Sequence, residues 1–292
     1  MPQLQTSDSA SSPIDSSSDG PKQDPAAPSR SNIPATASLA VDRIQRWILA
    51  GGLLALVAGS WSYLAYVDWA MRHMDLVAMA MPSAGAWATA DFMLVFVMWA
   101  VMMVAMMLPS AIPTLRVYRA VVATRDETRS PEALTALFAA GYLFTWTIFS
   151  AAATWTQSTL HGFTFVSPAM RASTPTIAGV LLVAAGVYQW TPLKSACLAR
   201  CAFPLQFLTR HWRSGASGAW RMGILHGAYC AGCCWLLMAL LFVYGMMNLA
   251  WIVAIAAYVL AEKLLPLQRW LPRAAGALLV LWGGSVLWFT RL

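Results

Sequence analysis

Residues 223–238 read GILHGAYCAGCCWLLM and lie inside an apolar run that covers residues 221–244. A membrane-spanning helix needs about 20 consecutive, mostly apolar residues, so this run predicts a helix that crosses a bilayer. Three cysteines, Cys230, Cys233 and Cys234, nevertheless fall within five residues of it. Thiolates are soft ligands that favour Cu(I), Zn(II) or iron–sulfur chemistry. The segment therefore indicates both a membrane fold and the place of its chemistry.

The rest of the chain has the composition of a multi-pass membrane protein. Only 11% of its residues are charged and 59% are hydrophobic, whereas soluble domains are roughly 25% charged. We expect an all-α, polytopic transmembrane helix bundle of about seven spans. Six spans with a re-entrant hairpin is the alternative, because the fourth run is short and the fifth and sixth nearly touch around Asn248. The seven apolar runs are 47–67, 88–108, 133–156, 175–192, 221–244, 247–265 and 273–290.

The N-terminal residues differ from all of these runs. Residues 1–40 are rich in Ser, Pro, Asp and Ala and contain almost no large apolar side chains. Such a segment buries too little surface to offset its ordering entropy, which predicts disorder. It also lacks the basic, apolar and small-residue order of a signal peptide. We expect a disordered tail over 1–40 and a transmembrane helical domain over 41–292.

Lysine and arginine are shared unevenly among the segments that flank the runs. With the N-terminus placed inside, fourteen of them lie on the inner side and three on the outer side. Because basic loops stay in the cytoplasm, this predicts a bacterial inner-membrane protein with a cytoplasmic N-terminus. The net charge of +7 is spread along these segments rather than gathered in one patch with stacking aromatics. The expected partner is thus the lipid bilayer and not nucleic acid.

Five residues of the 221–244 run repeat at the spacing of one helix face. Residues three or four apart on an α-helix lie on the same side, so their side chains meet. Gly223, Gly227 and Gly232 lie between them and would let a neighbouring helix approach closely. The five are His226, Cys230, Cys233, Cys234 and Met238.

Two other sulfur-containing groups lie at a similar predicted depth. Cys197 and Cys201 are four apart, just past Pro192, which we expect to end or kink the fourth run. Lys194 and Arg200 flank them with charges that attract a thiolate. The second run adds the methionines of 98–107, and thioethers bind Cu(I) but are poor zinc ligands. The candidate metal ligands are therefore Cys230, Cys233, Cys234, Cys197, Cys201, His226, Met238, Met102 and Met106.

Each of these residues also has a purely structural interpretation. Methionine commonly fills gaps in helix packing, and a lone buried cysteine behaves as a small hydrophobe. His226 fits packing as well as ligation, although an ionisable residue inside a membrane indicates function. Glu262 and Lys263 fit an anchor pair that reaches the surface and pairs with itself. Asp91 and Gln189 fit caps or contacts between helices.

We favour a protein that handles Cu(I) through its cysteines, by ligand exchange between sulfurs, over an enzyme. Zn(II) is the alternative metal, and an iron–sulfur cluster would need four of the five thiols. A membrane thiol–disulfide oxidoreductase using Cys230 and Cys233, which form a Cys-x-x-Cys pair, is the enzymatic alternative. A metal-dependent assembly factor for a membrane enzyme is the third. No ATP-binding motif and no haem-attachment motif is present. A metal-donor or metal-acceptor protein is the expected partner, and the predicted reducing side disfavours structural disulfides.

Three stretches also resemble a known family. They are residues 99–111 (WAVMMVAMMLPSA), residues 185–194 (AGVYQWTPLK) and residues 227–235 (GAYCAGCCW), continued by Met238 and the Glu262–Lys263 pair. Together they resemble the bacterial family of predicted metal-binding integral membrane proteins, a numbered domain of unknown function in which some members are labelled copper chaperone. The resemblance covers about residues 90–265 and leaves out the N-terminal tail. It implies metal binding, with copper as the metal.

Overall fold

The regular structure of this chain is helical throughout the part that can be described. The computed structural model describes residues 35–73, 88–125, 129–162, 175–244, 248–265 and 270–290, and every regular element there is a helix, as the sequence predicts. The elements are α1 (Ala35–Arg72), α2 (Thr89–Ala123), α3 (Pro131–Gly162), α4 (Pro175–Tyr188), α5 (Pro192–Ala202), α6 (Pro204–His211), α7 (Gly215–Ala239), α8 (Leu241–Tyr244), α9 (Leu249–Leu264) and α10 (Trp270–Phe289).

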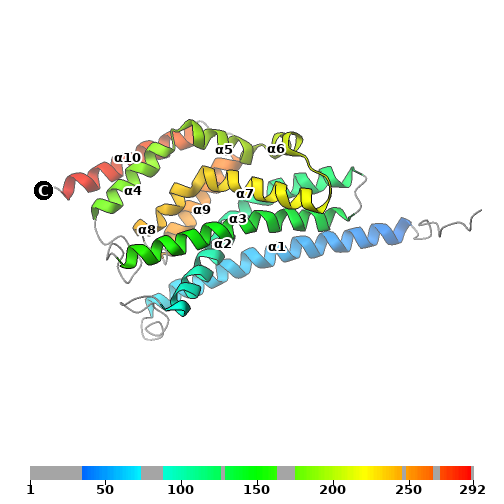
Figure 1. Cartoon of the computed structure of the whole chain (residues 1–292), viewed down its shortest axis with the longest axis horizontal. Coiled ribbons are helices and arrows are strands. Elements are labelled where there is room, and N and C mark those ends of the chain that lie inside the picture. The colour runs from blue at the N-terminus through cyan, green and yellow to red at the C-terminus, as the bar shows by residue number, and fades with distance from the viewer. Residues whose placement is uncertain are drawn as a thin grey trace, which may run out of the picture. The chain divides into compact units, whose positions relative to one another are not determined.

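The chain divides into two units, residues 1–43 and residues 44–292. We predicted a disordered tail over residues 1–40. Of these, residues 1–34 lie outside the described part of the chain, and residues 35–40 belong to α1. The helices from α2 to α10 all fall in the second unit (Figure 1). This second unit contains every candidate ligand and is the subject of the description that follows.

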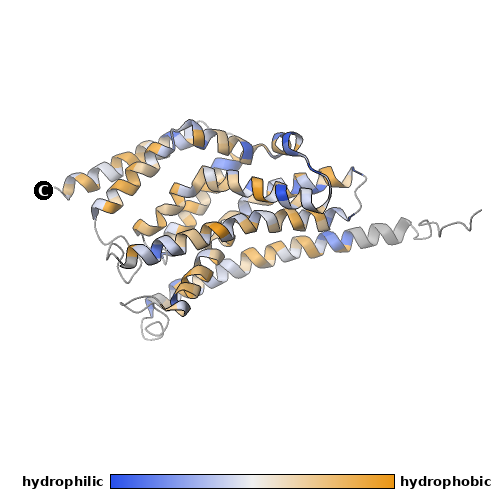
Figure 2. Ribbon diagram, viewed as in Figure 1, coloured by the Kyte–Doolittle hydropathy of each residue, from blue (hydrophilic) through white to orange (hydrophobic). Residues whose placement is uncertain are grey.

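Several helices are long and apolar enough to cross a membrane. Five pass this test singly within the described residues, and α4 with α5 passes as a pair bent by 65°. Each of the seven predicted runs contains a described helix, but α9 has 16 residues, about 24 Å at 1.5 Å per residue, short of the roughly 30 Å hydrocarbon layer. The described chain therefore offers five spans, or six with the bent pair, and the bend lies before Pro192, where the sequence predicts an end or a kink. Hydrophobic residues follow these helices along their length, whereas α6 is largely hydrophilic (Figure 2).

Helix α2 is longer than the sequence predicts. We expected a span that ends at residue 108, before Pro109, yet α2 continues to Ala123 through both Pro109 and Pro113. Membrane helices tolerate proline where side chains and neighbouring helices satisfy main-chain groups. Near Pro109, Ser110 Oγ and Tyr142 OH donate to the Met107 carbonyl over 2.8 Å and 3.0 Å. The methionine run 98–107 therefore lies in the middle of a helix and not at its end.

Glycines allow α7 to approach its neighbours closely, as predicted. A Cβ at Gly223 would overlap the carbonyl oxygen of Phe138 on α3, and one at Gly227 would lie 2.7 Å from Thr145 Oγ1. On the other side, a Cβ at Gly232 would lie 3.0 Å from the Cys197 sulfur on α5. Helix α7 is thus held between α3 and α5 at the level where its cysteines lie.

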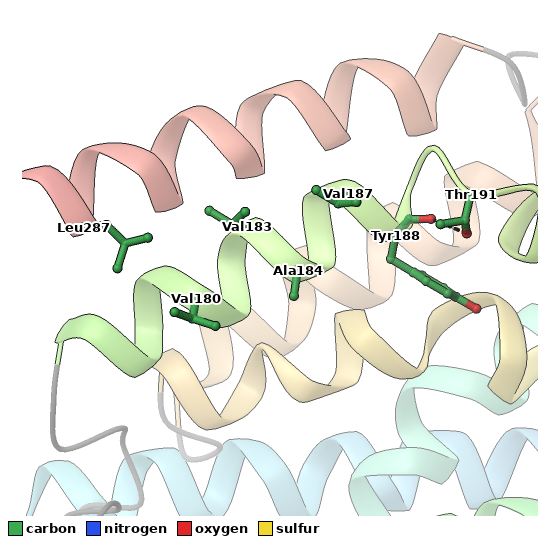
Figure 3. Close-up of a pocket in the computed structure, with 7 residues that line it drawn as sticks. All are labelled: Val180, Val183, Ala184, Val187, Tyr188, Thr191 and Leu287. Atoms are coloured by element: carbon green, nitrogen blue, oxygen red, sulfur yellow. Dashed lines mark hydrogen bonds between the residues drawn. The ribbon is translucent and has the colours of Figure 1, made fainter.

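Helix α4 pairs with α10 and also reaches α7. Gly186 on α4 and Gly276 on α10 meet back to back, each facing the other's carbonyl oxygen. Beside this contact is a pocket lined almost wholly by apolar side chains of α4 together with Leu287 (Figure 3). Tyr188 points from this region toward α7 (Figure 3) and donates to the Gly232 carbonyl. The end of α4 is thereby fixed beside the cysteines of α7.

Candidate functional site

The five residues predicted to share one face of α7 all point into the protein. His226, Cys230, Cys233, Cys234 and Met238 are each at most 2% exposed. Trp235, which lies between them on the opposite side of the helix, is 45% exposed. The 3.6-residue spacing therefore identified the buried stripe correctly. All five cysteines of the chain are free thiols.

Four thiols from two helices meet at this stripe. Cys201 on α5 belongs to the same buried core cluster as Cys230, Cys233 and Cys234 on α7, and it lies close enough to Cys230 and Cys233 for the three thiols to interact. Cys234 is in the same kind of contact with Cys230 and Cys233. In addition, the Cys233 and Cys234 thiols each donate to the Cys230 carbonyl oxygen over 3.0 Å. We call these four residues, Cys201, Cys230, Cys233 and Cys234, the sulfur cluster.

Cys197 lies at the margin of the sulfur cluster. Its side chain is partly exposed, whereas Cys201, one turn further along α5, is only 5% exposed. Its sulfur packs against Gly232. Among the other thiols, that of Cys233 interacts with it electrostatically. The predicted pair on α5 therefore divides into one residue inside the sulfur cluster and one beside it.

Cys230 is the thiol with the most polar neighbours. Lys263 Nζ on α9 donates to its sulfur over 3.0 Å and to Ser110 Oγ over 2.7 Å. The hydroxyl of Tyr142 lies 3.2 Å from the same sulfur. Within the described residues, no carboxylate forms an ion pair with Lys263. A buried ammonium thus faces the central thiol of the cluster.

The cation beside the thiols is not the one expected from sequence. Lys194, predicted to attract a thiolate, instead forms a buried ion pair with Glu262, whose Oε1 lies 2.8 Å from its Nζ. Arg200 lies over the ring of Tyr229, 4.7 Å from its centre. Sequence reasoning also treated Lys263 as half of a surface anchor pair with Glu262, which is wrong. The signal that would have found it is a lysine inside an otherwise apolar helix.

Glu262 belongs to a separate polar cluster between α9 and α5. Besides Lys194, it accepts a hydrogen bond from Tyr258 OH over 2.6 Å. Gln189 Oε1, just after α4, lies 3.5 Å from that hydroxyl on α9. Of the two roles predicted for Gln189, a cap or a contact between helices, the structure therefore shows the contact. Asp91 takes the other role, because its carboxylate accepts from the Ala88 main-chain nitrogen at the start of α2. The two neighbouring residues of α9 therefore serve two different clusters.

His226 is buried among aromatic rings. The rings of Phe138, Tyr142 and Phe207 have centres within 6 Å of the imidazole. Its Nδ1 atom has no hydrogen-bond partner among the described residues. A buried polar atom without a partner is unusual and calls for an explanation such as a ligand or an ion.

The methionines complete the surroundings of the sulfur cluster. Met102, Met106 and Met238 are at most 2% exposed and belong to the same apolar core as the four thiols. No three His, Cys, Asp or Glu side chains in the described part of the chain are already arranged around a common metal position. The donors are therefore gathered in one buried region, where the Cys233 and Cys234 thiols are hydrogen-bonded to the main chain.

The comparisons with known proteins agree with this chemistry. No curated protein and no solved structure matches the chain. The profile of one family, PpoB2, described as copper chaperone, matches residues 96–286. This interval contains every candidate ligand and all of α3 to α9. The chain therefore belongs to the PpoB2 copper chaperone family.

Proposed function

We propose that this protein binds Cu(I) at the sulfur cluster and passes it to another protein by ligand exchange. The observation that supports this most directly is the gathering of four buried thiols from α5 and α7 beside a buried ammonium. Soft thiolates favour Cu(I) or Zn(II), and the thioethers beside them suit Cu(I) but are poor ligands for zinc. The copper chaperone description of the family supports the same metal.

Lys263 gives this proposal a charge argument. Cu(I) held by two thiolates is a complex with one net negative charge, and a buried charge is costly unless an opposite charge compensates it. The Lys263 ammonium, 3.0 Å from the Cys230 sulfur, supplies that opposite charge. A copper–dithiolate complex in this position would in turn provide the anionic partner that Lys263 lacks among the described residues. The Lys263 ammonium and the anionic copper–thiolate complex thus balance each other's charge.

The donors take five different roles under this proposal. Cys230 is the central ligand, with Cys201, Cys233 and Cys234 as its exchange partners. His226, through its unpartnered Nδ1, and Met238 are auxiliary ligands on the same helix face. Met102 and Met106 form a path of weaker thioether ligands along α2, and Cys197, the partly exposed thiol, is the contact point with a donor or acceptor.

The transfer itself requires no redox step. One copper–sulfur bond forms as another breaks, the copper stays Cu(I), and each thiol that binds releases its proton. We place the protein in the bacterial inner membrane with its N-terminus in the cytoplasm, because fourteen Lys and Arg residues flank that side against three on the other. The donor or acceptor would then meet a reducing compartment, where thiols stay free.

The test is a Cu(I) titration of detergent-purified protein under reducing conditions against a Cu(I)-selective chelator. We expect the wild type to compete for Cu(I), and the Cys230→Ser/Cys233→Ser/Cys234→Ser variant to lose this binding. Cys197→Ser is the matched control, since it also removes a thiol but leaves the sulfur cluster, and it should retain the binding. A wild type that takes up no Cu(I), or a triple variant that binds as the wild type does, contradicts the proposal. Tighter binding of Zn(II) in the same assay would favour the alternative metal.

A further inference from the structure

A second polar site lies away from the sulfur cluster, where the chain turns from α6 into α7. Arg210, at the end of α6, Arg213, in the connection, and Arg221, on α7, line a pocket of about 530 Å³. Its other wall is apolar and includes Ile224, Leu225 and Ala228 of α7. The pocket therefore joins a cationic rim to a hydrophobic wall.

The three arginines have no acidic partner in the part of the chain that the structure describes. The ion pairs found there join Arg72 to Asp68, Arg119 to Glu132 and Lys194 to Glu262. Arg210, Arg213 and Arg221 are all exposed. An unopposed group of three guanidinium ions is complementary to an anion, and arginine binds phosphate oxygens through two parallel hydrogen bonds.

The position of the pocket in the fold indicates where that anion comes from. Helix α7 is one of the helices able to span a membrane, and Arg221 lies in its second turn, whereas Ile224, Leu225 and Ala228 follow toward its middle. Helix α6 exposes the apolar Leu205 beside the polar Gln206 and Arg210, a mixture typical of a helix at the membrane surface. The cationic rim thus lies where lipid headgroups would be, and the apolar wall lies where acyl chains begin.

We propose that this pocket is a binding site for an anionic phospholipid. The phosphate of the headgroup binds the three arginines, and the upper part of an acyl chain packs against Ile224, Leu225 and Ala228. Basic pockets beside membrane helices recognise anionic headgroups by this chemistry. A free phosphate ion would use the arginines but leave the apolar wall uncovered, so the lipid is the better fit. A bound lipid would hold the α6–α7 turn at the bilayer surface.

The test measures retention of phosphatidylglycerol and phosphatidylcholine by the full-length protein, using native mass spectrometry from detergent. The wild type should retain phosphatidylglycerol in preference to phosphatidylcholine. Arg210→Gln/Arg213→Gln/Arg221→Gln should weaken phosphatidylglycerol binding on the order of 100-fold, since each basic contact near a membrane surface contributes about a fivefold factor. The matched control, Arg43→Gln/Arg46→Gln/Arg116→Gln, removes three other exposed arginines and the same charge, and should leave binding unchanged.

Further arms separate the lipid from other anions and from misfolding. The lysine version of the pocket variant, Arg210→Lys/Arg213→Lys/Arg221→Lys, should keep most of the binding, which a folding defect would not allow. Inorganic phosphate at millimolar concentration should not displace the lipid. Equal loss in the control variant, no preference for the anionic lipid, or full displacement by phosphate overturns the proposal. So does unchanged lipid retention in the glutamine variant, which would leave the pocket to an acidic protein segment.

Discussion

Two neighbouring residues of α9, Glu262 and Lys263, serve buried clusters of opposite character. Glu262 faces Lys194, with both carboxylate oxygens within 3 Å of the ammonium nitrogen, and receives the Tyr258 hydroxyl. Lys263 faces the sulfur of Cys230 and the hydroxyl of Ser110. The first cluster pairs each charge with its opposite. The second presents a cation to neutral or weakly acidic groups.

This difference indicates a structural role for the cluster around Glu262 and a chemical role for the cluster around Lys263. A buried ion pair with all its partners present is a self-contained contact between helices, and removing one member leaves an uncompensated charge. An ammonium whose neighbours are thiols has its charge balanced only when one of those thiols becomes an anion. We therefore assign the Lys194–Glu262 cluster to the packing of α5 against α9, and the Lys263–Cys230 cluster to the binding of a metal by thiolates.

The largest effect is expected from breaking the complete pair. Lys194→Met leaves Glu262 buried without its cation, which should lower the free energy of unfolding by about 3–5 kcal/mol. Unfolding of the purified protein in mixed micelles, followed by circular dichroism, measures this. The double variant Lys194→Met/Glu262→Gln removes both charges and keeps an acceptor for Tyr258, so it should recover most of the loss. A single variant as stable as the wild type would show that the pair has no structural role.

The second prediction concerns the incomplete cluster. Lys263→Met removes the cation beside Cys230, so a copper–thiolate complex there loses its charge balance. Hydrogen bonds to charged groups contribute about 1.5–3 kcal/mol, and we expect Cu(I) affinity to fall by about 10- to 100-fold. Competition with a Cu(I) chelator measures the change.

Two comparisons sharpen this result. Lys263→Arg keeps the charge and should recover part of the affinity. Lys194→Met/Glu262→Gln removes neighbouring charges that do not touch a thiol, so its affinity should match the wild type. If Lys263→Met binds Cu(I) as tightly as the wild type, Lys263 does not balance the charge of the site.

Sequence reasoning predicted the stripe on α7 because helical spacing alone determines which side chains share a face. The apolar runs likewise predicted a helical bundle, and small residues predicted that a neighbouring helix approaches α7 closely. These features depend on residues close in sequence. The length of α2 was missed, because its passage through Pro109 depends on Tyr142 from another helix, which donates to the Met107 carbonyl.

The partners of the buried charges were missed for a related reason. Lys194 lies near Cys197 and Cys201 in sequence, but its partner Glu262 is on a distant helix. Glu262 and Lys263 are adjacent in sequence, and consecutive residues of a helix point in different directions, so they did not pair with each other. Which of these charged residues meets the thiols depends on how α5, α7 and α9 pack against one another. No spacing within one segment contains that information.

The third prediction divides the two cysteines of α5. Cys201 contacts Cys230 and Cys233, whereas Cys197 is partly exposed at the margin. Cys201→Ser should therefore lower Cu(I) affinity about tenfold, and Cys197→Ser by less than about twofold. The chelator competition assay compares them directly, and both variants replace one sulfur by one oxygen on the same helix. Equal losses would place both thiols in the site, and no loss in either would confine the ligands to α7.

The smallest equilibrium effect is expected from the thioethers of α2. Met102→Leu/Met106→Leu keeps side-chain volume nearly constant, so stability should change by less than about 1.5 kcal/mol and Cu(I) affinity by less than about threefold. If these thioethers form a path, transfer of Cu(I) to a chelator should nevertheless slow, because weak intermediate ligands have been removed. Stopped-flow measurement of that transfer is the decisive readout. Met103→Leu/Met107→Leu, on the adjacent positions of the same buried run, is the control. Slower transfer in the first variant alone assigns a path to Met102 and Met106, whereas equal rates in both variants and the wild type assign the whole run to packing.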